Sequence, residues 1–168
     1  MERAAAAPSA ITHHEPAPVT PLLRQILFAI IIMLAVSANA WSADGAGSVK
    51  TLSGSGTVIR ASSVLPVSTG QLVYRGDRIV SAQDSYVGIM LYDDTRLTLG
   101  PGSELLIREF EFNPNSNGGD LAVAFLKGTV RVVTGLIGKN APEKVQFYTP
   151  SAMVGVRGTE FVVDVEAK

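Results

Sequence analysis

Short runs of apolar and β-branched residues, each ended by a turn signal, recur along the chain from Trp41 onward. In the run Tyr86–Tyr92, Val, Ile and Leu alternate with Tyr, Gly and Met, and at the end of the run Glu104–Phe112, Glu alternates with Phe. This is the period of two that a pleated strand requires. No run in this part has the period of about 3.6 residues that marks an amphipathic helix. The sequence therefore predicts an all-β domain, either a compact β-sandwich or a short twisted β-solenoid of many short strands.

Turn signals predict two hairpins in the middle of this domain. Asp93-Asp94 follows one strong run, and Lys127-Gly128 separates two others. The glycine-containing segment Thr134–Pro142 is expected to be a loop.

The closing segment Tyr148–Val163 is expected to form a strand, a tight turn and a second strand. Apolar residues alternate with others from Ala152 to Val156 and again from Phe161 to Val165. Arg157-Gly158-Thr159 interrupts the pattern, and glycine takes a positive φ at little steric cost.

An export signal precedes the predicted domain. Arg24 is followed by the apolar stretch Ile26–Val36 and then by the small residues Ala38 and Ala40, which is the layout of a secretory signal peptide. The stretch is shorter than the roughly 20 residues of a spanning helix. We therefore expect cleavage after Ala40 and no permanent membrane span, with retention of the signal as an anchor left as an alternative.

The expected cleavage site helps to divide the chain into three parts. We expect an N-terminal extension with a signal-peptide helix over residues 1–40, a flexible lead-in over 41–48 and a β-domain over 49–168. Val19 is an alternative start that gives a signal of ordinary length. The mature domain is expected to be periplasmic or secreted.

Composition excludes several classes of function. The chain has 14 Lys and Arg against 15 Asp and Glu, and no predicted strand carries a basic cluster, so no nucleic-acid partner is expected. It has no cysteine, and its two histidines, His13 and His14, precede the expected cleavage site. These absences remove Ser–His and Cys–His nucleophiles, the usual ligands of zinc and any disulfide framework. We therefore expect a domain without cofactor or metal that is not an enzyme.

Several blocks of sequence, in a fixed order from Val49 to Val165, resemble the FecR-domain family of bacterial envelope proteins. The less specific blocks are Gly56-Thr57-Val58, Gly70-Gln71-Leu72, Arg75–Ile79, Tyr86–Ser103 and Leu126–Arg131. The specific block is the last one, whose structural signature consists of Thr149, Pro150, Val156, Arg157, Gly158, Thr159 and Phe161.

The resemblance implies an exported all-β module that works by contact with another macromolecule. The namesake regulators combine a cytosolic helical segment that holds a sigma factor, a membrane span, this domain and a receptor-docking domain. The chain resembles the third part alone. The family has Asp-Gly where this chain has Asp93-Asp94. Because Asp tolerates the left-handed conformation less well than Gly, we expect a slightly strained or lengthened turn there.

Two groups of side chains are candidates for binding. Arg157 either contacts a ligand or partner, or locks the closing strands by bonding carbonyls or a carboxylate such as Asp77. Tyr86, Met90 and Tyr92 share one face of a strand. That face is either covered by other strands or forms an exposed aromatic surface.

The acidic residues have two interpretations each. Asp93 and Asp94 fit turn chemistry better than a calcium site with Glu104 or Asp120, because the spacing of a calcium loop is missing. Glu104, Glu109 and Glu111 fit solvated edge charges better than a carboxylate pair that hydrolyses glycosides.

The sequence thus predicts a non-catalytic module for protein interaction or signal sensing in the cell envelope. A carbohydrate- or peptidoglycan-binding module is the alternative, and a carboxylate hydrolase is the least favoured. An unpaired sheet edge would favour the first, an exposed row of Tyr86 and Tyr92 the second, and two facing acids in a cleft the third.

Overall fold

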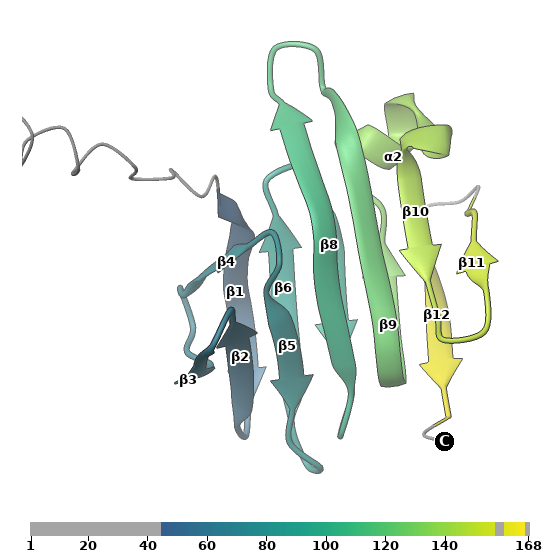
Figure 1. The fold of residues 1–168 in the computed structure, drawn as a ribbon. Coiled ribbons are helices and arrows are strands. Elements are labelled where there is room, and N and C mark those ends of the chain that lie inside the picture. The colour runs from purple at the N-terminus through teal and green to yellow at the C-terminus, as the bar shows by residue number, and fades with distance from the viewer. Residues whose placement is uncertain (1–44, 157–159, 167–168) are drawn as a thin grey trace, which may run out of the picture. The chain divides into compact units, whose positions relative to one another are not determined.

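One curled sheet of twelve strands forms the part of the chain that the structure describes. The structure is a computed structural model that describes residues 45–156 and 160–166, so the predicted signal peptide with Ala38 and Ala40, and the turn Arg157-Gly158-Thr159, lie outside it. The sheet curls so that its two halves, layers A and B, face each other (Figure 1). The all-β prediction is confirmed, and a single curled sheet takes the place of the expected sandwich or solenoid.

Each layer has a defined strand order. Layer A runs β4 (Leu72–Tyr74), β1 (Gly45–Ser53), β6 (Tyr86–Leu91), β7 (Arg96–Leu99), the second half of β9 (Gly118–Val133) and β12 (Glu160–Val165). Layer B runs β3 (Ser63–Pro66), β2 (Gly56–Arg60), β5 (Arg78–Ser81), β8 (Glu104–Asn113), the first half of β9, β10 (Val145–Tyr148) and β11 (Met153–Val154). All pairs are antiparallel except β9 with β10.

The segment between β9 and β10 is helical, although a loop was expected there. It contains the short helix α2 (Leu136–Asn140) and the 3-10 turn η2 (Pro142–Lys144). Ile137 is fully buried, which anchors this segment to the core. No helix in the described part of the chain is long and apolar enough to cross a membrane.

The predicted hairpin at Lys127-Gly128 is wrong, because β9 continues through these residues as one strand of 16 residues. Gly128 has a φ of +75°, and a β-carbon there would lie 2.5 Å from the Ser103 hydroxyl. Ser103 Oγ accepts the N–H of Thr129 at 2.9 Å and donates to its carbonyl at 3.0 Å. The glycine therefore bends the strand from layer B into layer A instead of reversing it.

The β-domain begins earlier than expected, because residues 45–48 belong to β1 and not to a flexible lead-in. Ala46 is fully buried, and a β-carbon on Gly47 would lie 2.2 Å from the Met90 carbonyl oxygen. The small residues that suggested a linker instead allow β1 to approach β6 closely.

The closing segment does not form a hairpin of its own two strands. β11 pairs with β10 in layer B, whereas β12 pairs with β9 in layer A. The reversal lies earlier, at Pro150-Ser151, where Thr149 N–H donates to the Ala152 carbonyl at 2.8 Å and Thr149 Oγ1 accepts the Ala152 N–H at 3.1 Å. This turn gives β11 its partner before β12 is reached.

Aromatic contacts tie the closing strands to the core. The Phe125 and Phe147 rings stack with centroids 5.5 Å apart, and Phe161 meets Phe147 edge-on at 5.1 Å. These three residues lie on β9, β10 and β12 and link the two layers across the core. Phe161, a residue of the family signature, therefore has a packing role.

The hairpin of β6 and β7 forms as predicted, with a strained turn. Asp94 has a φ of +66°, and Leu91 accepts the Asp94 N–H at 3.1 Å, so a type I turn ends in a left-handed residue. The neighbouring Asp93 is fully buried, and its carboxylate accepts the Thr95 N–H and hydroxyl at 3.1 and 2.7 Å. Asp93 is thus a structural residue of the turn.

Replacing Asp94 by glycine is expected to raise the free energy of unfolding by about 0.5 kcal/mol. Glycine adopts a positive φ without steric cost, and its looser unfolded chain offsets part of that gain. Urea denaturation of the wild type and Asp94→Gly measures the difference, with Asp94→Ala as the control that is expected to be less stable than both. A lower free energy of unfolding for Asp94→Gly than for the wild type would contradict backbone strain at Asp94.

Candidate functional site

The curl of the sheet brings β3 and β4, which stand at opposite ends of its strand order, to the same side, where an ion pair bonds β4 (Figure 1). Arg60 Nε and Nη2 each donate to the Asp77 carboxylate at 2.7 Å, and Nη2 also donates to the Leu72 carbonyl at 3.1 Å. The same carboxylate accepts the Tyr74 N–H at 2.9 Å. Two backbone groups of β4 are thus bonded by side chains, and the guanidinium lies 4.1 Å from the centre of the Tyr74 ring.

Burial strengthens this pairing. Asp77 is fully buried, and its hydrogen bond to Arg60 raises the pKa of the arginine above its ordinary value. Arg60 is thus a partner of Asp77, whereas Arg157, for which Asp77 was considered as one possible partner, lies outside the described residues. We call β3, β4 and the Arg60–Asp77 pair the sealed end.

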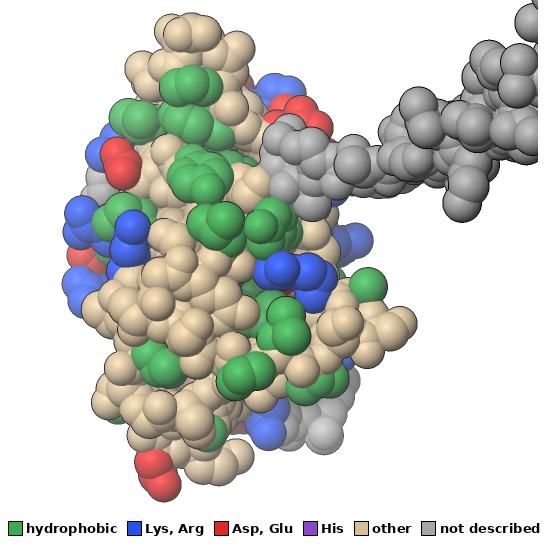
Figure 2. Space-filling view, turned by 90° about the vertical axis from the view of Figure 1, so that its left-hand side faces the viewer, with side chains coloured by type: hydrophobic (Ala, Val, Ile, Leu, Met, Phe, Trp, Pro, Cys, Tyr) green, Lys and Arg blue, Asp and Glu red, His purple; other side chains and the backbone are tan. Residues whose placement is uncertain are grey.

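The described surface of the sealed end carries hydrophobic and basic side chains side by side (Figure 2). Figure 2 looks onto this side, where hydrophobic side chains lie in separate groups with Lys and Arg side chains among them. Val64 and Leu72 are exposed there, but β3 is only four residues long and ends in Pro66, which has no N–H to offer. Short length and proline are both means by which sheets avoid edge-to-edge association.

The opposite end of layer A is open. β12 is six residues long, and among the described residues it pairs with β9 alone. Thr129 of β9 points toward β7, since its carbonyl accepts the Gly100 N–H at 2.8 Å and its N–H donates to Ser103.

The direction of the free backbone groups of β12 follows from this orientation of Thr129. In an antiparallel ladder, successive residues point to opposite sides, so Val130 and Val132 point toward β12 and bond Val163 and Phe161. Val162, between them, turns its N–H and C=O away from β9. We call this side of β12 the open edge.

The core is thinly covered next to the open edge. Phe161 and Val163 of β12 and Val154 and Val156 near β11 are only partly buried. On the outer surface, Val162 is 60% exposed and Met153 is 65% exposed. The open edge therefore combines free backbone groups with apolar surface, which is what an added strand requires.

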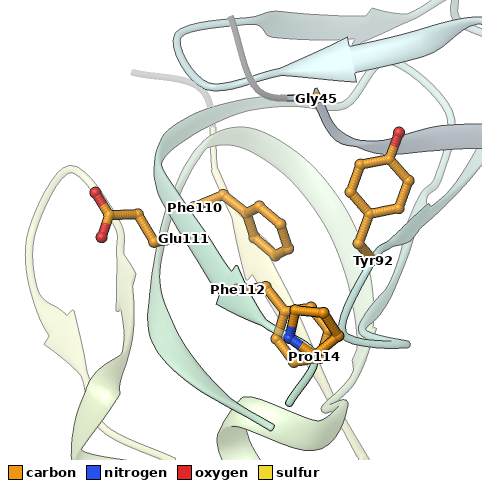
Figure 3. Close-up of a pocket in the computed structure, with 6 residues that line it drawn as sticks. All are labelled: Gly45, Tyr92, Phe110, Glu111, Phe112 and Pro114. Carbon is orange, nitrogen blue, oxygen red and sulfur yellow. The ribbon is translucent and has the colours of Figure 1, made fainter. Parts of the chain in front are cut away.

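An aromatic pocket lies near one end of β8. Tyr92, Phe110, Phe112 and Pro114 gather around a space of about 590 Å³, while Glu111 points to the other side of its strand (Figure 3). Gly45 completes the lining, next to the Tyr92 ring. Among the described lining residues, Glu111 is the charged one and its carboxylate points away, so the ring surfaces suit the apolar face of a ligand (Figure 3).

Of the two alternatives for the outer face of β6, the structure shows the uncovered one. Val87, Ile89 and Leu91 are buried, but Tyr86 is 52% exposed and Met90 is partly exposed, because no described strand lies over the outer face of layer A. Tyr92 is also 52% exposed, yet it lies in the turn after β6 and lines the pocket. The three residues therefore do not form one continuous row.

Some signature residues line a second pocket, of about 560 Å³. Thr149 and Pro150 lie there with charged residues of both signs, namely Arg78, Glu104, Lys127, Asp164 and Glu166. Glu104 pairs with Arg78, and Asp164 Oδ1 accepts the Thr129 hydroxyl at 3.1 Å. These contacts hold neighbouring strands together.

The acidic residues considered for calcium are not brought together. Asp120 pairs with Lys144 at 3.0 Å, a contact that raises the pKa of Lys144, while Glu104 lies at the far end of β8. Among the described residues, no group of acids is arranged to hold a metal ion. Glu109 and Glu111 are exposed on β8.

Comparison with known protein families matches residues 77–168 to a family described as FecR protein. The chain belongs to the FecR family. The match contains the whole closing signature and the hairpin of β6 and β7, and it begins at Asp77, the buried carboxylate of the sealed end. No curated protein and no solved structure matches the chain.

Family membership places this FecR domain among signal-related, regulatory modules. Sequence reasoning missed two of the residues on which the site depends. Arg60 lies outside the matched segment and 17 positions from Asp77, and Val162 looked like one more residue of an alternating strand. For Arg60, the only signal in the sequence was its position as a lone arginine at the end of a β-strand.

Removing the cation of the sealed end is expected to destabilise the FecR domain. Arg60→Met leaves the Asp77 carboxylate buried without its partner, and we expect a loss of about 2 kcal/mol, less than for a wholly buried pair because the Arg60 side chain is partly exposed. Chemical denaturation measures the loss. The double variant Arg60→Met/Asp77→Asn should recover part of it, and equal stability of Arg60→Met and wild type would exclude the sealing role.

Proposed function

We propose that this FecR-family protein is an exported, non-catalytic module that binds a protein partner in the periplasm and serves in interaction or signal sensing. The observation that carries the proposal is the open edge of β12, whose outward N–H and C=O groups adjoin exposed Val162 and half-buried Phe161. A segment of a partner that adds as a strand satisfies these backbone groups and covers the apolar surface.

The contrast between the two ends supports this use of β12. At the sealed end, an ion pair, a short strand and a proline oppose pairing with another chain. At the open edge, β12 contains no proline, and its described ion pair, Glu160 with Arg131, joins two side chains and bonds no backbone group. Export follows from the predicted signal peptide at residues 24–40, and the regulatory setting follows from the family.

Val162→Pro is expected to abolish capture of the partner while the domain stays folded. The Val162 N–H points away from β9, so proline removes no existing ladder bond, but it removes the outward donor and places its ring in the way of an added strand. Capture from a bacterial envelope extract, followed by mass spectrometry, compares Val162→Pro with Val162→Thr, which keeps the N–H and the β-branched shape.

The proposal requires that proteins bound by the wild type and by Val162→Thr disappear with Val162→Pro. Circular dichroism and cooperative unfolding of all three proteins establish that the fold is unchanged. Recovery of the same proteins with folded Val162→Pro would refute binding through this edge.

The aromatic pocket supports a second candidate, binding of an envelope carbohydrate such as peptidoglycan. Three ring side chains around about 590 Å³ offer surfaces on which the apolar faces of a sugar pack. Co-sedimentation with purified peptidoglycan tests this candidate. Tyr92→Ala should weaken binding about tenfold, whereas Tyr86→Ala, an exposed tyrosine outside the pocket, should not, and equal binding by both variants would exclude the pocket as the site.

A further inference from the structure

The side chains of β12 divide into two kinds. Glu160, Val162 and Asp164 lie on the outer face, and Phe161 and Val163 lie on the inner face, where they are partly buried. From residue 160 to 166 the chain has three acids, including Glu166, and no base. The open edge is therefore negatively charged on the outside and apolar on the inside.

A strand that adds to this edge continues the pleat, so each of its residues shares a face with the residue directly opposite. Positions opposite Phe161 and Val163 extend the core and favour apolar residues. Positions opposite Glu160 and Asp164 face two carboxylates and favour lysine or arginine, since opposite charges across strands attract and like charges repel.

We infer that the open edge binds an extended protein segment with two basic residues four positions apart and apolar residues beside the central position between them. This inference rests on the proposed function and names the chemistry of its partner. The ion pair of Glu160 with Arg131, at 2.6 Å, does not prevent it, because both side chains are more than half exposed and such pairs contribute little.

A second copy of the chain is disfavoured as the partner for two reasons. Antiparallel pairing of two β12 strands about Val162 places Glu160 of each copy opposite Asp164 of the other, which brings like charges together twice. If β12 of one copy paired with the sealed end of another, it would find the Leu72 C=O and the Tyr74 N–H already bonded by Arg60 and Asp77. A different, basic chain fits better than either arrangement.

Two nine-residue peptides test the inference against the full chain, expressed from Met1 in a bacterial host and purified as the host processes it. The first is acetyl-TVKVTVKVT-amide with a fluorescent label, and the second carries glutamate in place of both lysines. In fluorescence anisotropy we expect the lysine peptide to bind at least about tenfold more tightly, because each opposed charge pair changes sign. Val162→Pro should bind neither peptide.

A charge reversal on the protein provides the matched control. Asp164→Lys should reduce the preference for the lysine peptide, whereas Glu111→Lys, the same change at an exposed site on β8, should leave it unchanged. Equal affinity for both peptides, or equal effects of the two variants, would overturn the inference that the open edge prefers a basic segment.

The outcomes separate this inference from the proposed function. If envelope proteins bind the wild type but not Val162→Pro, while the lysine peptide does not bind, the inference fails and the proposed function stands. If neither the peptide nor any envelope protein depends on Val162, both fail.

Discussion

The fold depends on one contact, between the bend of β9 at Gly128 and the hydroxyl of Ser103. Ser103 Oγ bonds both the N–H and the C=O of Thr129, and the missing β-carbon of Gly128 gives it room. Before the bend β9 pairs with β8 and β10, and after it with β7 and β12. The two layers are therefore joined through a continuous strand, and the positions of the last strands follow from this one bend.

The bend also determines where the sheet remains unpaired. Because β9 crosses into layer A, β12 finds a partner there on one side and has no strand beside it on the other among residues 45–156 and 160–166. The Phe125, Phe147 and Phe161 rings hold β12 in place from inside, so the open edge rests on the core and not on a loop. At the other end of layer A, Asp77 and Arg60 occupy backbone groups that β4 would otherwise present. The two outer strands of layer A thus differ in what they offer to another chain.

Local alternation was enough to predict an all-β domain and most of its strands, since each depends on neighbours in sequence. The strained turn was predicted from Asp93-Asp94 standing where the family that the sequence resembles has Asp-Gly. Lys127-Gly128 was misread because a glycine with positive φ serves a hairpin and a bent strand equally well. The partner of β12 was missed because pairing is decided by tertiary packing, and a tight turn at Pro150-Ser151 had already reversed the chain. The exposure of Tyr86 was equally undecided, since apolar residues on both faces of β6 fit a covered or an uncovered strand.

The Arg60–Asp77 pair has a consequence for how many molecules take part in a complex. A sheet with two free sides grows, because each added strand presents a new side for the next molecule. Here the outward groups of β4 are bonded by a guanidinium and a carboxylate, so a copy of the protein cannot receive the open edge of another copy at β4. The ion pair thereby opposes growth of the sheet from one molecule to the next through β4.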